Sequence, residues 1–322
     1  MQTKTVSIII PVKPGGAVKA LDALLKLDYP VDAVEIMVAE GRCPSRQRNM
    51  AAASAGGEII CFLDDDSMVG ARFLYRVASH YNDPATAVVG GPSLTPATDP
   101  PLQQGFGLAL SSLFGSGSVR NRYRQSGRVR KAADNELILC NLSMRREVFR
   151  AYGGFDERLY PNEENELLER IRKDGLTLLH DPELVAYRSQ RRNLRAFVRQ
   201  IFGYGSGRAR QTLISRSCGV ANLVPAAFLI YLCALLFTDK PVYYLPLLCY
   251  LGMDILSACC ESARGGKLAL APLLFCLFPI QHLSYGAGLL WEFLTFRFRK
   301  MSPKNSEVTL RRIKKFGQYP VA

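Results

Sequence analysis

The N-terminal part of the chain alternates short apolar runs with segments whose apolar residues recur at helical spacing. The runs at 6–12, 34–39 and 58–63 have the length and composition of buried strands. The leucine-rich segment 21–27 and the alanine-rich segment 45–56 predict helices between them. Strands and helices that alternate at this spacing predict an α/β fold with a mostly parallel sheet and right-handed crossovers.

Charged side chains follow the predicted strands where they end. They are Lys13 after the first strand, Glu40 and Arg42 after the second, and Asp64, Asp65 and Asp66 after the third. Ligands of open α/β sheets bind at these strand ends. Three adjacent carboxylates repel one another unless a cation joins them, and a divalent ion shared with substrate phosphates would remove the repulsion. The alternative is an acidic turn in which Asp66 or Ser67 caps a helix expected near Ala71.

A different pattern begins after residue 219. Segments 220–237, 242–260 and 268–291 are apolar, and charge or histidine interrupts them only at Asp254 and His282. Each segment is long enough to span a bilayer, or nearly so, and two or three transmembrane helices are therefore expected. Mean hydropathy is +0.03 although 21% of residues are charged, which agrees with two unlike halves.

Two further segments are predicted from their polarity. Between residues 194 and 208 an apolar stripe is interleaved with arginine, which predicts a helix in the membrane interface, with a core-packed amphipathic helix as the alternative. Residues 100–131 are too long and polar for a buried element and predict a binding loop or lid, with plain disorder as the alternative.

The positive charge of the chain is localised. Residues 116–131, 186–216 and 297–315 together hold 22 of the 41 Lys and Arg residues and one acidic residue, while the formal net charge is +13. Beside apolar segments, these stretches indicate anionic lipid and phosphate, and no recognisable motif indicates nucleic acid. The nine cysteines form no CxxC pair, which favours buried thiols in a reducing compartment over zinc ligands.

The orientation of the apolar half raises a conflict. The N-terminal half lacks an export signal, and the basic segment 297–315 is also expected in the cytoplasm. Three spans would place these two parts on opposite sides of the membrane. Either one segment lies in the interface or re-enters, or the basic segment defies the positive-inside rule.

Six motifs occur in an order that resembles the family 2 glycosyltransferases, which have the GT-A fold and an Asp-x-Asp motif. They are 7–12 (SIIIPV), 48–49 (RN), 57–66 (GEIICFLDDD), 141–149 (NLSMRREVF), 153–156 (GGFD) and 162–167 (NEENEL). The last motif and the apolar half are most similar to the branch that builds bacterial exopolysaccharides, such as succinoglycan, on lipid carriers.

The resemblance implies roles for the acidic residues. Asp66 and Asp64 would hold Mg²⁺ or Mn²⁺ on the diphosphate of a nucleotide sugar, with Asp64 also near the ribose and Asp65 in the variable middle position. Glu164 would be the catalytic base, with Glu163 in reserve. The family usually has Asp at the position of Glu164.

Further residues are assigned to nucleotide-sugar binding by the same resemblance. They are Pro11, Glu40, Arg48, Asp64, Asp65, Arg191 and Arg192. Glu40 stands where the family usually has an Asp that contacts uracil. Residues 190–195 (QRRNLR) stand where processive members have Gln-x-x-Arg-Trp, and the missing Trp favours transfer of a single sugar.

The expected protein is a metal-dependent, inverting transferase in cell-surface polysaccharide synthesis. It would move one sugar to a polyprenyl-phosphate-linked or other lipid-linked acceptor, with UDP as the expected carrier of the donor sugar and with oligomerisation or assembly partners possible. Two alternatives are an inactive nucleotide-sugar-binding membrane protein and a processive synthase.

The expected organisation has four parts in an inner-membrane, multi-pass protein. These are a cytoplasmic GT-A domain at 1–198, an amphipathic interfacial helix or linker at 199–219, a membrane region at 220–296 and a basic cytoplasmic tail at 297–322.

Overall fold

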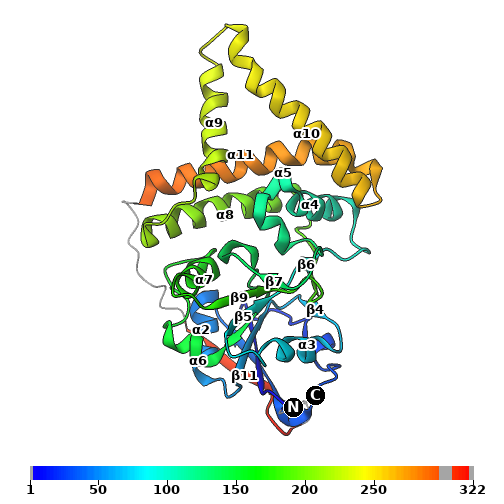
Figure 1. The fold of residues 1–322 in the computed structure, drawn as a ribbon, viewed down its shortest axis with the longest axis vertical. Helices are drawn as coiled ribbons and strands as arrows, with labels where there is room; N and C mark the ends of the chain where they lie inside the picture. Colours follow the sequence, from blue (N-terminus) through cyan, green and yellow to red (C-terminus); the bar gives the residue numbers. More distant parts are fainter. Residues whose placement is uncertain (1–2, 297–306, 319–322) are drawn as a thin grey trace. The chain divides into compact units, whose positions relative to one another are not determined.

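The computed structural model describes residues 3–296 and 307–318, which fall into two compact units (Figure 1). The sheet unit comprises residues 3–94, 121–188 and 307–318 of the described chain. The helical unit comprises residues 95–120 and 189–296. The predicted boundary at residue 198 is replaced by one after residue 188, because residues 194–215 form one continuous helix of the helical unit.

The sheet unit is built on an eight-stranded sheet in which five strands run in one direction. The predicted α/β fold with a mostly parallel sheet is confirmed. In spatial order the strands are β11 (Thr309–Lys314), β2 (Val34–Glu40), β1 (Val6–Val12), β3 (Ile59–Leu63), β8 (Asn141–Arg145), β5 (Thr86–Gly90), β9 (Thr177–His180) and β7 (Arg130–Lys131). The three predicted strands are β1, β2 and β3.

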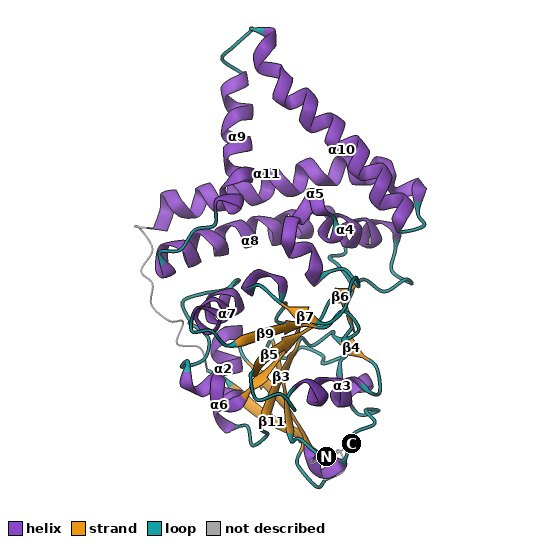
Figure 2. Cartoon of the chain, viewed as in Figure 1, coloured by secondary structure: helices purple, strands orange, loops and turns teal. Residues whose placement is uncertain are grey.

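Helices cover both faces of this sheet (Figure 2). One face packs against α1 (Leu21–Leu24) and α3 (Phe73–His80), the other against α2 (Pro44–Ser54), α6 (Arg146–Ala151) and α7 (Glu163–Lys173). Because alternate strand residues point to opposite faces, neighbours in one strand serve different cores. Ile8 and Ile10 belong to the first core and Ile9 to the second, all fully buried.

A small second sheet lies in the same unit. Its central strand β10 (Ala186–Tyr187) pairs with β4 (Met68–Val69) and β6 (Ser93–Leu94). The register sets Tyr187 opposite Met68, so the next residue, Arg188, lies beside the turn that follows β3. Two segments far apart in sequence therefore meet at the end of β3.

The last strand, β11, is not among the predicted elements. Residues 309–314 pair antiparallel with β2 from Glu40 back to Ile36, and the buried ammonium of Lys314 donates to the carbonyl oxygens of Val31 and Val34 at 2.9 and 2.8 Å. Residues 309–314 of the predicted tail at 297–322 are therefore a strand of the sheet and not part of a separate tail. Residues 297–306 and 319–322 lie outside the described residues.

The helical unit contains six α-helices in its described residues. They are α4 (Pro101–Ser111), α5 (Leu113–Ser116), α8 (Leu194–Ser215), α9 (Val224–Leu235), α10 (Leu245–Arg264) and α11 (Ala271–Thr295). The predicted loop at 100–131 is wrong for residues 101–116, because Phe106 and Leu110 of α4 are buried. Gly105 lets α4 approach α11: a Cβ there would lie 2.6 Å from a methyl carbon of Leu273.

Helix α11 runs along α8. A Cβ on Gly205 of α8 would meet the backbone of Tyr285, and one on Gly288 of α11 would meet the backbone of Phe202. Beyond this contact, the fully buried carboxylate of Glu292 accepts hydrogen bonds from Ser206 at 2.6 Å and Arg210 at 2.8 Å. Small residues bring the helices together and a buried ion pair joins them.

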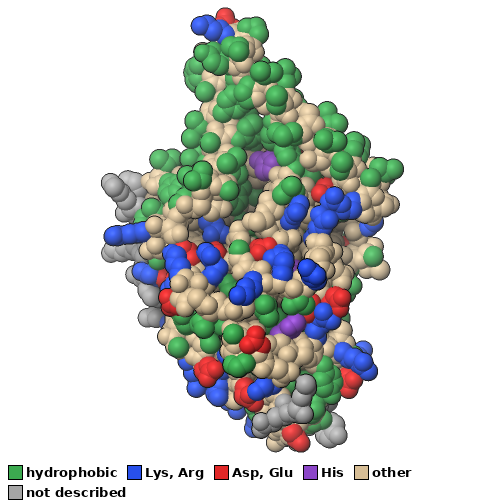
Figure 3. All heavy atoms as spheres, in the orientation of Figure 1, with side chains coloured by type: hydrophobic (Ala, Val, Ile, Leu, Met, Phe, Trp, Pro, Cys, Tyr) green, Lys and Arg blue, Asp and Glu red, His purple; other side chains and the backbone are tan. Residues whose placement is uncertain are grey.

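Helices α9 and α10 project from this layer as a hairpin (Figures 1 and 3). Their outward apolar side chains are exposed, as at Ile230, Leu248 and Leu256, and the exposed Asp239 and Lys240 lie at the tip. In the described chain, two helical segments are long and apolar enough to cross a membrane, Pro241–Arg264 and Leu268–Thr295. The first apolar segment gives only the shorter helix Val220–Leu235.

Candidate active site

Hydrogen bonds to backbone groups hold the three-carboxylate turn after β3. Ser67 Oγ accepts from the backbone N–H of Asp64 at 3.1 Å and donates to the carbonyl oxygen of Cys140 at 3.2 Å. The carbonyl oxygen of Asp65 accepts from the N–H of Ala20 at 2.9 Å. Among the described residues no side chain caps α3, so the capping alternative for Asp66 and Ser67 is wrong.

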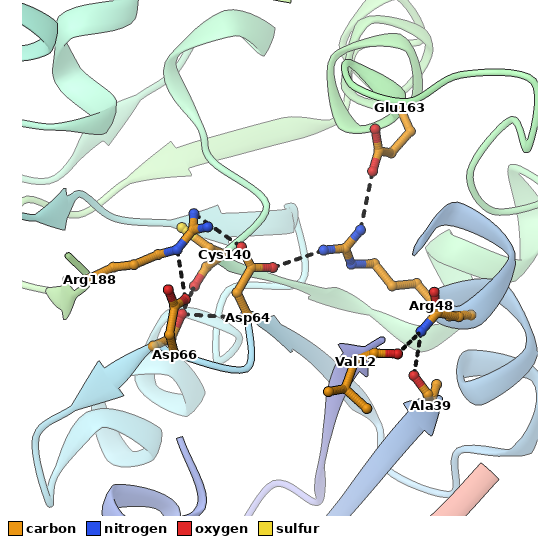
Figure 4. Close-up of polar contacts among 10 residues, drawn as sticks. Val12, Ala39, Arg48, Asp64, Asp66, Cys140, Glu163 and Arg188 are labelled. Atoms are coloured by element: carbon orange, nitrogen blue, oxygen red, sulfur yellow. Dashed lines mark hydrogen bonds and ion pairs between the residues drawn. The ribbon is translucent and has the colours of Figure 1, made fainter. Parts of the chain in front are cut away.

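Two arginines form ion pairs with carboxylates of this turn (Figure 4). Arg48, from α2, donates to Asp64 Oδ1 at 2.9 Å. Arg188, just after β10, lies 3.1 Å from Asp64 Oδ2 and donates to Asp66 Oδ1 at 2.7 Å. The segments of β10 and α2 thus bring one guanidinium each to the turn, which supplies part of the positive charge that three adjacent acids require.

Arg48 joins the turn to α7. Its second terminal nitrogen donates to Glu163 Oε1 at 3.2 Å, and its side chain is 5% exposed. Its Nε is buried without a hydrogen-bond partner in the described chain. Asp64, Arg48 and Glu163 therefore form one ion-paired chain across the strand ends (Figure 4).

The two candidates for the catalytic base lie side by side in the first turn of α7, and both are buried. Arg122 donates to Glu164 Oε1 at 3.1 Å, which fixes the orientation of that carboxylate. Burial raises the pKa of Glu163, and the adjacent charge of Glu164 raises it further. Asn162 precedes the helix at a φ of 86°, and its side chain makes no capping hydrogen bond within the described residues.

The donor atoms of the turn suit a divalent cation. Asp64 and Asp66 offer the hard oxygen ligands that Mg²⁺ and Mn²⁺ accept, and the Asp66 side chain is 41% exposed. Burial, followed by the charges of Asp66 and Asp64, raises the pKa of Asp65. The described residues contain no group of three or more His, Cys, Asp or Glu side chains that could hold an ion alone. The turn fits an ion whose remaining ligands come from substrate phosphates.

The end of β2 is also held by contacts of the described residues. Glu40 Oε1 accepts from the N–H of Gly15 at 3.0 Å, and Oε2 lies 3.5 Å from Arg311 of β11. Gln47 donates to the carbonyl oxygens of Val12 and Ala39 and so ties the ends of β1 and β2 together.

The remaining predicted binding residues fall in different units. Pro11 is partly exposed in β1, opposite Ala39. Arg191 and Arg192 belong to the helical unit, where Arg191 donates to Gln200 at 2.9 Å. The assignment of these two arginines to the nucleotide stays a prediction.

Sequence reasoning misses two arginines of the site. Arg122 lies in the segment interpreted as a loop, and Arg188 lies in a basic stretch interpreted as a site for anionic lipid and phosphate. The sequence does contain a signal for Arg188. It directly follows the short apolar run 184–187, just as charged residues directly follow the three predicted strands.

Comparison with known proteins shows which family the N-terminal part of the chain is similar to. Residues 16–153 match the family model Glycosyl transferase family 2. A solved structure, the mannosyltransferase PcManGT from Pyrobaculum calidifontis in complex with GDP-Man and Mn²⁺, matches with a TM-score of 0.55 at 15% identity, over 91% of this chain and 88% of that chain. Residues 16–153 are therefore similar to the family 2 glycosyltransferases, which confirms the resemblance seen in the six motifs, and the expected GT-A fold is confirmed.

Two curated proteins are similar to this chain in sequence. The chain is 29% identical over 205 residues to the succinoglycan biosynthesis protein ExoA of Rhizobium meliloti (strain 1021), an alignment that covers 62% of this chain. It is 26% identical over 168 residues to the pre-mycofactocin glycosyltransferase of Mycobacterium tuberculosis (strain CDC 1551 / Oshkosh), which covers 52% of this chain. These alignments span 58% and 34% of the two relatives.

Proposed function

We propose that this protein is an inverting glycosyltransferase that moves one sugar from a nucleotide sugar, UDP-linked by resemblance, to a lipid-linked acceptor at the cytoplasmic face of a membrane. The observation that carries the proposal is the ion-paired chain of Asp64, Arg48 and Glu163 at the strand ends of a GT-A sheet. The succinoglycan biosynthesis relative supports a role in polysaccharide synthesis.

The residues around the acidic turn suit the leaving diphosphate. Arg48 is fixed by two carboxylates and keeps a buried Nε with no partner among the described residues, and Arg188 presents a guanidinium that is 23% exposed. Guanidinium groups match phosphate oxygens well. Asp66 and Asp64 would hold Mg²⁺ or Mn²⁺, which would stabilise negative charge on the diphosphate when bound. A solved structural neighbour holds Mn²⁺, which supports this assignment.

The acceptor needs a base for its hydroxyl proton. We assign this role to Glu164, whose carboxylate Arg122 holds in a fixed orientation. Glu163 is the weaker candidate because its carboxylate is already paired with Arg48. Single displacement with a base on the acceptor inverts the anomeric configuration.

The test measures UDP release from UDP-sugars with Mn²⁺ and a lipid extract. Asp66→Asn and Glu164→Gln are each expected to lower the rate by about a hundredfold or more. Glu169→Gln, on the same helix and paired with Lys173, is the matched control and should retain activity. UDP binding should survive in Glu164→Gln because the base acts on the acceptor.

Undiminished UDP release in both site variants, with folding intact, would end the catalytic assignment. Specific UDP-sugar binding without any release, in wild type as in the variants, would favour the inactive binding protein. Products longer than one added sugar would favour the processive synthase.

We also propose a membrane arrangement in which the hairpin of α9 and α10 inserts into the bilayer while α8 and α11 lie at its interface. Because β11 pairs with β2 in one sheet, the chain leaves and re-enters the sheet unit on one side, so it crosses an even number of times. Helix α11 packs along the arginine-bearing α8 and shares the buried Arg210–Glu292 pair, which would be costly at membrane depth.

The only tryptophan of the chain tests this arrangement. Trp291 is 51% exposed on α11. In vesicles, its fluorescence is expected to be quenched more strongly by lipids brominated near the headgroup than by lipids brominated near the end of the acyl chain. Stronger quenching by the deep bromines would place α11 inside the bilayer and contradict the arrangement.

A further inference from the structure

Arg188 occupies the carboxylate oxygens that a cation would need. Of the four oxygens of Asp64 and Asp66, three lie within 3.1 Å of an arginine nitrogen, and two of these three contact Arg188. A divalent ion binds oxygen ligands at about 2.0–2.6 Å. An ion held by both Asp64 and Asp66 would lie beside the guanidinium that contacts the same two carboxylates, and their like charges would repel.

The two arginines differ in their freedom to move. Arg48 is 5% exposed and is held between Asp64 and Glu163, on two separate elements. Arg188 is 23% exposed and follows a strand of two residues. Of these two cations, Arg188 is the one that can leave the turn without losing a buried partner on α7.

We propose that Arg188 is a built-in counter-ion that competes with the divalent cation for Asp64 and Asp66, and that it transfers to the donor diphosphate when the two arrive together. The proposal rests on the proposed function for the identity of its anion. Its first consequence is that the cation alone binds weakly, because it must displace Arg188 with no new partner for the guanidinium. Its second consequence is that diphosphate and cation bind with positive cooperativity.

The experiment measures Mn²⁺ binding to the full chain from the loss of the free-Mn²⁺ electron paramagnetic resonance signal, with and without UDP. Without UDP, Arg188→Met is expected to bind Mn²⁺ about tenfold more tightly than wild type, since the competitor is gone. With saturating Mn²⁺, the same variant is expected to bind UDP about tenfold more weakly, since a phosphate partner is lost.

Two further variants keep the test decisive. Arg172→Met removes an exposed arginine that pairs with Asp134 at the last turn of α7, and should leave both affinities unchanged. If Arg188→Met fails to fold, Arg188→Lys serves instead. The lysine ammonium is a single point charge in place of the guanidinium that contacts two carboxylates, so this variant should show an intermediate gain in Mn²⁺ affinity.

Unchanged Mn²⁺ affinity in a folded Arg188 variant would overturn the proposal. The Mn²⁺ affinity measured without nucleotide is sufficient to test the role of Arg188. Failure of the wild type to bind UDP or any nucleotide sugar in the presence of Mn²⁺ would instead count against the proposed function. The two failures are therefore distinguishable.

Discussion

Single residues in the sheet unit show how charge is balanced around short strands. Asp181, at the turn between β9 and β10, is fully buried. It accepts from Arg76 at 2.5 and 2.9 Å, and its Oδ2 lies 2.7 Å from His80 Nε2. Burial alone would raise the pKa of Asp181, but the hydrogen bonds from His80 and Arg76 outweigh it and hold the pKa well below its ordinary value.

Asp181→Asn is expected to lower the free energy of unfolding by about 3 kcal/mol at neutral pH, since it breaks a buried ion pair. A carboxylate whose folded pKa is depressed stabilises the fold above its ordinary unfolded value, and this stability is lost as pH falls. The melting temperatures of wild type and variant should therefore converge as the solution is acidified.

The matched control is Glu183→Gln. Glu183 also contacts Arg76, at 2.6 Å, but its side chain is 64% exposed, so the substitution should change stability by less than about 1 kcal/mol. A deficit in Asp181→Asn that stays constant across pH would contradict the electrostatic explanation.

The site could be predicted from sequence only where a residue's chemistry and its place in a strand pattern agreed. Asp64, Asp66 and Arg48 follow or face buried strands, and the structure brings them together. Whether Arg188 and Arg122 belong to the site depends on where β10 and the 3-10 helix Gly117–Arg122 lie in space. No local spacing encodes those positions, since the partners lie 122 residues apart for Arg188 and Asp66 and 42 apart for Arg122 and Glu164.

Among the elements, α8 and α11 depend most on glycine. A side chain on Gly288 would collide with the backbone of α8, whereas a Cβ on Gly203 of α8 would meet nothing within 4 Å. The same substitution therefore has opposite expected effects at the two positions.

Gly288→Ala is expected to lower the free energy of unfolding by about 1–3 kcal/mol, because the helices must separate and the Arg210–Glu292 pair is strained. Gly203→Ala should be neutral or stabilise the protein by up to about 1 kcal/mol, since alanine favours a helix. Thermal unfolding in detergent compares the two variants. Equal effects at both positions would argue against close packing at Gly288.

The strands β1, β2 and β3 were predictable because buried parallel strands are continuous apolar runs. Helix α4 was not, because Pro100, Gly105 and Gly107 indicate a loop in isolation. In the folded helical unit the proline precedes the helix and Gly105 permits contact with α11. Tertiary packing decided the element against its local propensity.

For the whole molecule, β11 is the feature that sequence patterns could not supply. Half of its six residues are basic, and it joins the edge of the sheet through backbone hydrogen bonds. A stop codon at position 307 is expected to lower the free energy of unfolding by at least about 2 kcal/mol, through lost ladder hydrogen bonds and an exposed β2 edge. Thermal unfolding and light scattering would measure the loss and the resulting aggregation.

Arg311→Gln is the control for this truncation. It removes the charge that lies 3.5 Å from Glu40 but leaves the backbone pairing of β11 in place. It should therefore retain nearly all of the stability. A truncated chain as stable as wild type would show that β2 does not depend on its neighbour.

The position of β11 also sets an order of events during synthesis. The ribosome completes the strand that covers β2 only after it has made α8 to α11. Until then the nascent sheet has an open edge, and Glu40 lacks the neighbour that the finished chain provides. The apolar helices are therefore synthesised before the sheet can be completed. A molecule with a complete sheet is one whose helical unit has already been made.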